Sequence, residues 1–203
     1  MSYTEAQVIG RISTVLFDAS SAVWGTAVIR QGIDAALVEI AVEGKPYIVL
    51  ATVTTSAGTK SVDISTVSGL LHGNSEQSFE TVEFRVDKSP MRKRNFEIKG
   101  GRLAMEIDFL PDASEDVRLY VRKVHVLSGS TNSMDPVQEQ LLIELAAARL
   151  AISKAVDYIG EITDGINPDQ KMGVWGERKL AGVLQRLRGL KETEWNIQWP
   201  RGA

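Results

Sequence analysis

The stretch FLPDASEDVRLYVRKVHVL, residues 109–127, decides the fold class, because it alternates apolar and polar residues while both ends of the chain have helical periodicity. It predicts the end of one strand, a polar turn at residues 111–114, and a second strand over residues 117–126. The alternation resumes at Val124 after Val121, a shift that predicts a β-bulge. A sheet is therefore expected in the middle of the chain.

Five segments that lead into this stretch alternate in the same way and also predict strands. They are YIVLATVTT (47–55), SVDIS (61–65), TVEFRV (81–86), NFEIK (95–99) and RLAMEIDF (102–109). The Lys-Gly-Gly sequence that ends at Gly101 is a tight-turn signal between the last two strands. Together the segments predict a small antiparallel sheet with one buried face.

Helical periodicity begins at Thr4, which is expected to cap a first helix whose apolar residues recur at three-and-four spacing. After a turn at residues 17–25, Thr26 is expected to cap a second helix with the same pattern. That helix ends at Gly44, since glycine suits a C-cap and Pro46 cannot continue a helix. The chain therefore opens with a helical hairpin.

Helical periodicity returns after a linker at residues 127–136. Asp135 is a natural N-cap and Pro136 suits the first position of a third helix, which is expected to run to Ile159. A fourth helix is predicted over residues 175–190.

The predicted fold class is α+β: mainly an α-helical bundle of about four helices, with an inserted small antiparallel β-sheet domain. The expected divisions are an N-terminal helical hairpin at 1–45, a β insertion domain at 46–128, C-terminal helices at 129–191 that pack with the hairpin, and a C-terminal tail at 192–203.

The composition excludes several classes of function. The chain has 203 residues and no cysteine, which excludes disulfides, thiolate catalysis and zinc sites built on sulfur. A formal net charge of −3 argues against a dedicated nucleic-acid binder, so any DNA contact is expected to be local. We recognise no signal peptide and no apolar run near the roughly 20 residues that span a bilayer, so we expect a soluble protein folded in the cytoplasm.

Catalysis, metal binding and cofactor binding are not expected. Neither His72 nor His125 has a second ligand at metal spacing, and His125 is expected on the polar face of a strand, exposed to solvent or satisfied by hydrogen bonds. No phosphate-binding loop and no G-x-S-x-G motif is present. Carboxylates do gather in one region of the sequence, and they are Glu106, Asp108, Asp112, Glu115 and Asp116.

Two groups of basic residues are candidates for binding acidic partners. Arg92, Lys93 and Arg94 lie in what is expected to be a connection between strands, either a solvated loop or a contact with an acidic partner or a phosphate backbone. The second group follows the polar side of the last two helices, which is either solvated or, in a ring of subunits, the lining of a channel for DNA. Its members are Arg149, Lys154, Arg178, Lys179, Arg186, Arg188 and Lys191.

The tail ETEWNIQWPRGA holds Trp195 and Trp199 in a largely polar segment. Tryptophans in such a tail either fold back onto the core or anchor the tail in a neighbouring protein, where tryptophan is enriched.

The order of elements and the amino-acid sequences of two segments resemble those of the head-to-tail adaptor (connector) proteins of tailed bacteriophages. Residues 4–41, TEAQVIGRISTVLFDASSAVWGTAVIRQGIDAALVEIA, resemble the N-terminal hairpin of the family, with a turn containing Asp and Ser, a tryptophan, and an alanine-rich second helix. The family often has Ser-Asp after that tryptophan, where this chain has Gly25 and Thr26.

The sheet region, residues 82–127, resembles the β insertion of these adaptors more closely. The matching features are Pro90 after a lysine, the Phe-Glu-Ile strand at 96–98, and the Tyr-x-x-Lys-x-His run of Tyr120, Lys123 and His125. The helix that follows MDPVQEQ is similar to the core helix of the family. The resemblance covers residues 4–159 and consists of packing and turn patterns.

The resemblance implies a structural virion protein without enzymatic activity or cofactor, made in the host cytoplasm and located in the neck of the virion. Adaptors of this family form a ring, usually a dodecamer, under the portal, extend the DNA channel, and provide a platform for tail or nozzle proteins. The implied partners are the portal protein, tail or nozzle proteins, further copies of the chain, and genomic DNA through non-specific contacts, with no membrane.

The resemblance and the composition of the tail also suggest roles for individual residues. Trp195, Trp199, Pro200 and Arg201 are the candidate portal-docking tail. The basic residues of the last two helices are candidates for the DNA channel or a subunit interface, and the basic triplet at 92–94 is the candidate contact with tail proteins.

Two alternatives remain open from the sequence. One is another phage tail-completion protein or an interaction module built on a helical stalk. The other is a hydrolase of cell-wall glycan that uses a carboxylate pair such as Glu106 and Asp108, which depends on a spacing in the fold that the sequence does not give.

Overall fold

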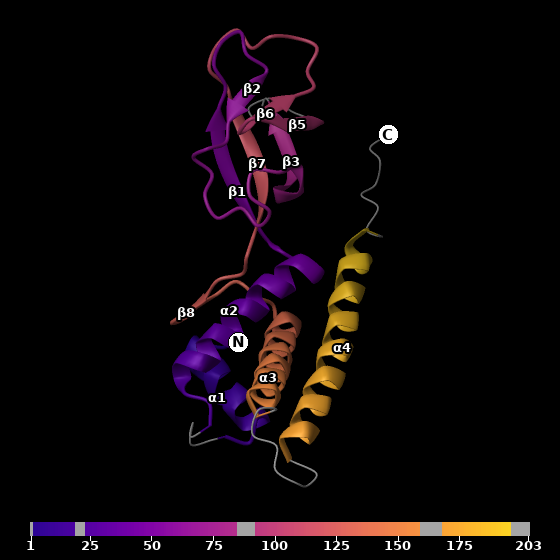
Figure 1. The fold of residues 1–203 in the computed structure, drawn as a ribbon. Coiled ribbons are helices and arrows are strands. Elements are labelled where there is room, and N and C mark those ends of the chain that lie inside the picture. The colour runs from indigo at the N-terminus through magenta and orange to yellow at the C-terminus, as the bar shows by residue number, and fades with distance from the viewer. Residues whose placement is uncertain (1, 19–22, 85–91, 159–167, 196–203) are drawn as a thin grey trace. The chain divides into compact units, whose positions relative to one another are not determined.

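The computed structural model of the chain describes residues 2–18, 23–84, 92–158 and 168–195, and contains both helices and antiparallel sheets (Figure 1). The α+β class is therefore confirmed, with strands forming a substantial part of the fold. The chain divides into two compact units. Met1–Lys45 and His125–Ala203 form the helical unit, and Pro46–Val124 form the β unit.

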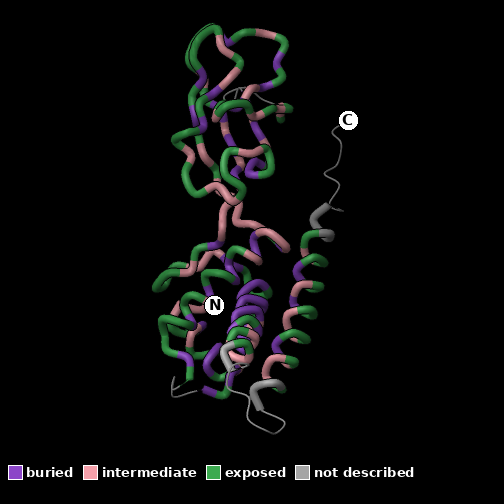
Figure 2. The backbone as a smooth tube through the Cα atoms, viewed as in Figure 1, coloured by how far each residue is buried: buried purple, intermediate pink, exposed green. Residues whose placement is uncertain are grey.

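The helical unit is built around one central helix. It contains α1 (Glu5–Val15), α2 (Thr26–Glu43), α3 (Pro136–Tyr158) and α4 (Pro168–Trp195). The central helix is α3, which packs against each of the other three and is largely buried along its middle (Figure 2). Its buried residues are Leu141, Leu142, Ile143, Leu145, Ala146, Ala147, Ala148, Leu150 and Ala151. Towards its two ends, Val137 and Val156 are exposed to solvent.

Two of the predicted helix caps are confirmed. The Thr4 side chain accepts a hydrogen bond from the backbone of Gln7, and the Gln7 side chain accepts one from the backbone of Thr4, which makes a reciprocal capping box. Asp135 Oδ1 accepts from the backbone N–H groups of Val137 and Gln138, each at 2.9 Å. Local polar sequence therefore fixes where α1 and α3 begin.

The predicted start of α2 is wrong by one residue. Gly25 is the N-cap, no side-chain hydrogen bond caps the helix, and Thr26 is its first residue. The predicted end at Gly44 is confirmed, but its φ is −112°, so a left-handed conformation is not the reason for glycine here. A Cβ at Gly44 would lie 2.9 Å from Leu187 of α4, which shows that close packing requires glycine at this point.

The last helix is much longer than the predicted 175–190, because α4 begins at Pro168 and continues to Trp195. Its first turns lack an apolar stripe and instead carry Gly173 and Gly176, which approach α3 closely. A Cβ at Gly173 would lie 2.9 Å from Ala155, and one at Gly176 would lie 2.8 Å from the carbonyl oxygen of Ala148. Small residues on both helices thus replace the large apolar side chains by which the sequence pattern is recognised.

The predicted linker at 127–136 is in part a small hairpin of β8 (Leu127–Ser128) and β9 (Thr131–Asn132). Two hydrogen bonds join it to the start of α1: the Glu5 N–H donates to the Gly129 carbonyl, and the Gly129 N–H donates to the Glu5 carboxylate, each at 3.1 Å. The side chain of Asn132 also donates to the buried Glu139 of α3.

The described residues of the β unit form two sheets, so the prediction of one sheet is wrong. The four-stranded sheet has the order β1 (Tyr47–Thr54), β7 (Asp116–Lys123), β3 (Phe79–Phe84) and β4 (Arg92–Arg94). The three-stranded sheet has the order β2 (Ser61–Asp63), β6 (Arg102–Met105) and β5 (Phe96–Lys99), and a 3₁₀ turn, η1 (Glu76–Ser78), precedes β3. All the pairings are antiparallel. Residues of both sheets share one core, in which Phe84 stacks on Phe109 and Phe79 meets Phe96 edge-on.

The strand predicted over residues 117–126 ends earlier, because β7 stops at Lys123. In the described pairings of β7 no bulge follows Val121, and the shift of register lies instead in β3, between Phe79 and Thr81. The apparent shift at Val124 marks the point where the chain leaves the β unit and His125 enters the helical unit.

Candidate functional site

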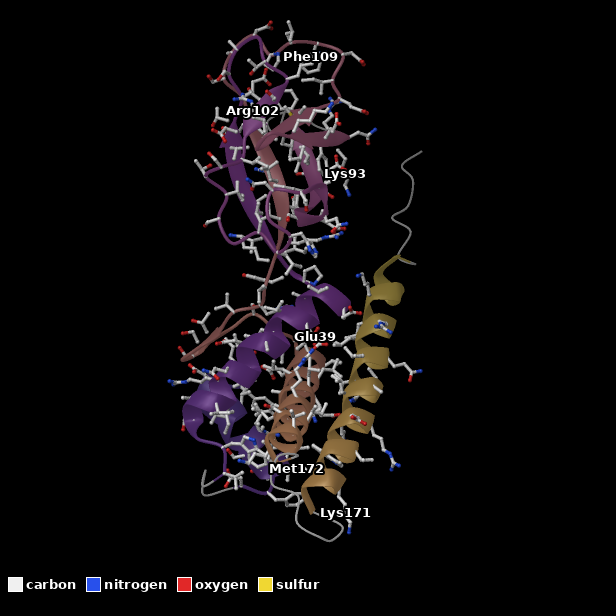
Figure 3. All side chains as sticks on the ribbon, viewed as in Figure 1. Glu39, Lys93, Arg102, Phe109, Lys171 and Met172 are labelled. Atoms are coloured by element: carbon white, nitrogen blue, oxygen red, sulfur yellow. The ribbon has the colours of Figure 1, made fainter. Side chains whose placement is uncertain are left out.

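Most of the predicted basic residues on α3 and α4 are paired with glutamates of the same helical unit. Arg149 of α3 donates from Nε to Oε2 of Glu39 on α2 (labelled in Figure 3) at 2.6 Å. Arg188 of α4 donates from Nε to Glu43 Oε2 at 3.1 Å. The hydrogen bond to Glu39 raises the pKa of Arg149. These contacts join α2 to its two neighbouring helices. They also mean that glutamates of the helical unit neutralise much of the basic charge on α3 and α4.

The Glu144 carboxylate of α3 binds two further cations from α4, with Lys179 Nζ at 3.4 Å and Arg186 Nη2 at 2.5 Å. Burial of Glu144 raises its pKa, but the hydrogen bonds from Arg186 and Gln140 outweigh that effect, and the pKa is lowered. Each paired cation keeps part of its surface, with exposed side-chain fractions of 51% for Arg186 and 43% for Lys179. The pairs therefore stabilise the packing of α3 on α4 and leave the cations in reach of a polyanion.

Two other predicted basic residues lie on the same helices. Arg178 is exposed on α4 and Lys154 is half-buried on α3. The last residue of the group, Lys191, donates from Nζ to the Val42 carbonyl oxygen at 3.1 Å and thereby joins the end of α4 to α2.

The basic triplet at 92–94 is a strand and not the predicted connection. It forms β4, the edge of the four-stranded sheet, with Arg94 opposite Val82 and Lys93 opposite Glu83. Lys93 is labelled in Figure 3. Short edge strands with cationic side chains discourage unwanted pairing with other sheets. The Nε of Arg94 is buried without a hydrogen-bond partner among the described residues.

The predicted docking tail falls largely outside the described residues. Trp195 is the last residue of α4, so the first four residues of the predicted tail, 192–195, belong to the helix. Trp199, Pro200 and Arg201 lie outside the described part of the chain.

His125 is buried and hydrogen-bonded, so the expectation of a strand residue on a polar face is wrong. Its Nε2 lies 2.8 Å from the Lys45 carbonyl oxygen, and its Nδ1 lies 3.1 Å from Ser133 Oγ. Because a carbonyl only accepts, Nε2 carries the proton and Nδ1 accepts from the serine hydroxyl. Gln138 Nε2 donates to the same carbonyl at 3.2 Å. Burial lowers the pKa of His125, which favours this neutral form.

The acidic residues named as candidates for hydrolysis lie at or near the surface of the β unit. Glu106 accepts a hydrogen bond from Asn95 Nδ2 at 3.0 Å, and Asp116 accepts one from Thr54 Oγ1 at 3.3 Å. His72 is exposed in a loop whose backbone is held by the Ser78 hydroxyl. In the described part of the chain, no three histidine or acidic side chains gather as ligands for a metal ion.

Phe17 is a feature that the sequence pattern did not indicate. It follows the C-cap of α1 with φ of +56°, the one non-glycine residue with positive φ among those described, and its side chain is 98% exposed. The backbone is fixed on both sides: the Phe17 N–H donates to the Thr14 carbonyl, and the Asp18 N–H donates to the Ser13 carbonyl at 2.9 Å. This pair of bonds is the Schellman motif, which usually places glycine where Phe17 stands.

The buried Asp18 secures this turn from the other side. Its Oδ2 accepts hydrogen bonds from the backbone N–H groups of Val23 at 3.1 Å and Trp24 at 2.8 Å. The Trp24 side chain is itself buried. The left-handed conformation of Phe17 is thus imposed by its neighbours, at a free-energy cost of about 1 kcal/mol or more for a residue with a Cβ.

A shallow groove lies at the other end of α1, between α1, the start of α2 and the β8–β9 turn. Its volume is about 520 Å³, its walls are mostly apolar, and we call it the α1–α2 groove. It is lined by Thr4, Glu5, Ala6, Ile9, Thr26, Arg30 and Gly129. The two charged residues in it neutralise each other, with Arg30 Nε 2.8 Å from Glu5 Oε1.

Of the helices in the described ranges, none combines the length and the apolar character needed to cross a bilayer. A scan against models of protein families finds none that matches this chain, and a search of curated proteins finds no match either.

Proposed function

We propose that this protein is a head-to-tail adaptor of a tailed bacteriophage: a structural, non-enzymatic virion protein that forms a ring under the portal. The ring extends the DNA channel and provides a platform for tail or nozzle proteins, and its location is the neck of the virion. The proposal starts from the resemblance of residues 4–159 to that family.

The observation that carries the proposal furthest is the division of the chain. Its two ends fold together as a helical unit, and the β unit is formed by the residues between them. An adaptor needs one part that makes a ring with other copies and another part that contacts the tail. We assign the ring and portal contacts to the helical unit, as a bundle of four helices, and the tail contacts to the inserted β unit.

The electrostatics fit a channel that DNA passes through without being held. Arg149, Lys179, Arg186 and Arg188 are paired with glutamates yet remain partly exposed, and Arg178 is exposed as well. Balanced charges bind phosphates weakly and non-specifically, because little net charge is available for counterion release. In the proposed ring, of twelve copies as in the family, these residues line the channel or a subunit interface.

Portal and tail contacts complete the proposal. The segment with Trp195, Trp199, Pro200 and Arg201 docks onto the portal, since tryptophan is enriched at interface anchors. The β4 edge with its basic triplet contacts acidic surfaces of tail proteins.

The test is the mass of the protein by light scattering, alone and mixed with the portal of the same phage. We expect a saturable complex with about one adaptor chain per portal chain, and no complex with the portal of an unrelated phage. The double variant Trp195→Ala, Trp199→Ala should bind the portal at least tenfold more weakly. A protein that stays monomeric and ignores its portal would support an interaction module in place of an adaptor.

A further inference from the structure

Phe17 combines two unfavourable features. Its neighbours impose the backbone conformation, but no contact in the described part of the chain requires a phenylalanine at this position. Its ring is 98% exposed, and its backbone is in the left-handed region, where glycine is the usual residue at this step of a helix end. Glycine would relieve the strain and expose no aromatic ring. Strained residues that persist in this way are enriched at functional sites, and a lone exposed aromatic side chain is suited to insertion into another surface.

The α1–α2 groove offers a surface of matching chemistry. Its apolar walls and its volume of about 520 Å³ can accept an aromatic side chain. The groove is also electrically neutral, because Glu5 and Arg30 form an ion pair with each other, and Glu5 Oε2 in addition accepts from the Gly129 N–H. An uncharged ring can therefore enter without leaving a buried charge unpaired, whereas a charged side chain could not.

The groove of one molecule cannot receive the Phe17 of the same molecule. Thr4, Glu5, Ala6 and Ile9 place the groove at the first turns of α1, and Phe17 follows the last turn. The helix has 11 residues and is roughly 16 Å long at 1.5 Å per residue. A projecting side chain and a groove at separate places on one chain make a heterologous contact, which repeats from copy to copy and forms a ring where the rotation between copies closes.

We propose that Phe17 of one copy inserts into the α1–α2 groove of the next copy and sets the register of the subunits. This inference rests on the proposed function, because it supplies a contact for the ring. One phenylalanine buries about 150–250 Å², a small part of the roughly 1,200–2,000 Å² of a stable interface. The contact is therefore weak by itself, and free copies associate only transiently until the portal gathers them.

Disulfide trapping detects such a transient contact, and the chain is suited to it because it contains no cysteine. Phe17→Cys and Ala6→Cys are purified separately and mixed under mild oxidation. Both positions are exposed, so the variants should fold. We expect at least tenfold more mixed dimer than when Phe17→Cys is mixed with Ser153→Cys, which is exposed on α3 outside the groove. Equal yields from the two mixtures would overturn the proposal.

Assembly on the portal gives a second readout. Phe17→Ser, with an unchanged circular dichroism spectrum, should lose most of the portal-bound copies in the mass measurement, and Ser153→Ala should lose none. If Phe17→Ser assembles normally on the portal and no selective disulfide forms, the proposed contact between Phe17 and the α1–α2 groove is overturned. The adaptor function is unaffected by that result. Trapping of Phe17→Cys to a cysteine of the portal, without the Ala6→Cys dimer, would reassign Phe17 to the portal and overturn contact between copies.

The two proposals fail separately, because the mixture of Phe17→Cys with Ala6→Cys contains no portal. If the unchanged protein does not bind its portal but the Phe17→Cys and Ala6→Cys pair forms selectively, the contact between copies is supported and the adaptor function is not.

Discussion

His125 is held in its neutral form inside the helical unit, and this couples the stability of the unit to pH. Burial lowers its pKa below the ordinary value of 6.5, against the opposing effects of hydrogen bonding to Lys45 and Ser133 and of the nearby Asp135 carboxylate; the Lys45 charge adds to the lowering. The unfolded chain therefore binds a proton more readily than the folded chain. Folding is favoured fully above the unfolded pKa, and that stability is lost as the pH falls below it.

We expect the free energy of unfolding to decrease between pH 8 and pH 5.5, by up to about 1.4 kcal/mol for each unit by which the pKa of His125 is lowered. Urea unfolding at both pH values measures the decrease. His125→Gln, which keeps a donor for the Lys45 carbonyl, should show a smaller decrease, and His72→Gln, in an exposed loop, should match the unchanged protein. Equal pH dependence in all three proteins would exclude His125 as the cause.

The strain at Phe17 gives a second prediction. Phe17→Gly and Phe17→Ala both remove the exposed ring, but only glycine removes the strain of a Cβ at φ of +56°. We expect the glycine variant to be more stable to urea than the alanine variant by about 1 kcal/mol. An alanine variant of equal or greater stability would show that the turn carries no strain.

At the scale of residues, local features could be predicted and long-range ones could not. Thr4 and Asp135 were recognisable as caps because their hydrogen-bond partners lie within three positions along the chain. The burial of His125 depends on Lys45, which is 80 positions away, so alternation along one strand misplaced it. The exposure of Phe17 is not predictable from the local sequence, because it depends on a turn that Asp18 stabilises by accepting a hydrogen bond from the backbone of Trp24.

Close packing of α4 on α3 requires glycine only on the face of α4 that contacts α3. A Cβ at Gly176 would lie 2.8 Å from the Ala148 carbonyl oxygen and 2.8 Å from Ile152 Cγ1, whereas one at Gly182 would meet no atom within 4 Å. Replacing glycine by alanine is therefore expected to destabilise the protein at Gly176 and to stabilise it at Gly182.

We expect Gly182→Ala to stabilise the protein by up to about 1 kcal/mol, because alanine favours the helix. Gly176→Ala gains the same propensity but forces α4 away from α3, which costs about 1–3 kcal/mol. The two variants should thus differ by about 2 kcal/mol in thermal or urea unfolding. If Gly176→Ala were as stable as Gly182→Ala, the close approach of the helices would be refuted.

At the scale of elements, periodicity predicted most helices and strands but not their full extents. The pattern does not predict the first turns of α4, because Gly173, where these turns approach α3 closely, carries no apolar signal. The strand β4 was missed because its three residues are all basic and it is recognisable only by its pairing with β3. Pairing across 10 or more residues, as between Val82 and Arg94, is not encoded in local alternation.

At the scale of the whole molecule, the α+β class followed from the change of period between the ends and the middle of the chain. The number of sheets did not, because alternation shows that a strand has one buried face without showing which sheet it joins. The candidate site could be predicted only in part: the basic residues of α3 and α4 were recognisable, but their glutamate partners come from helices whose packing the sequence does not specify.

The central claim, an adaptor that assembles on a portal, is a statement about several copies of the chain. Its most direct test is the mass by light scattering of the full-length protein mixed with the portal of its own phage. The account predicts a saturable increase in mass that corresponds to a ring of chains on each portal. An unchanged portal mass, together with a protein that remains monomeric at the highest concentration tested, would contradict it.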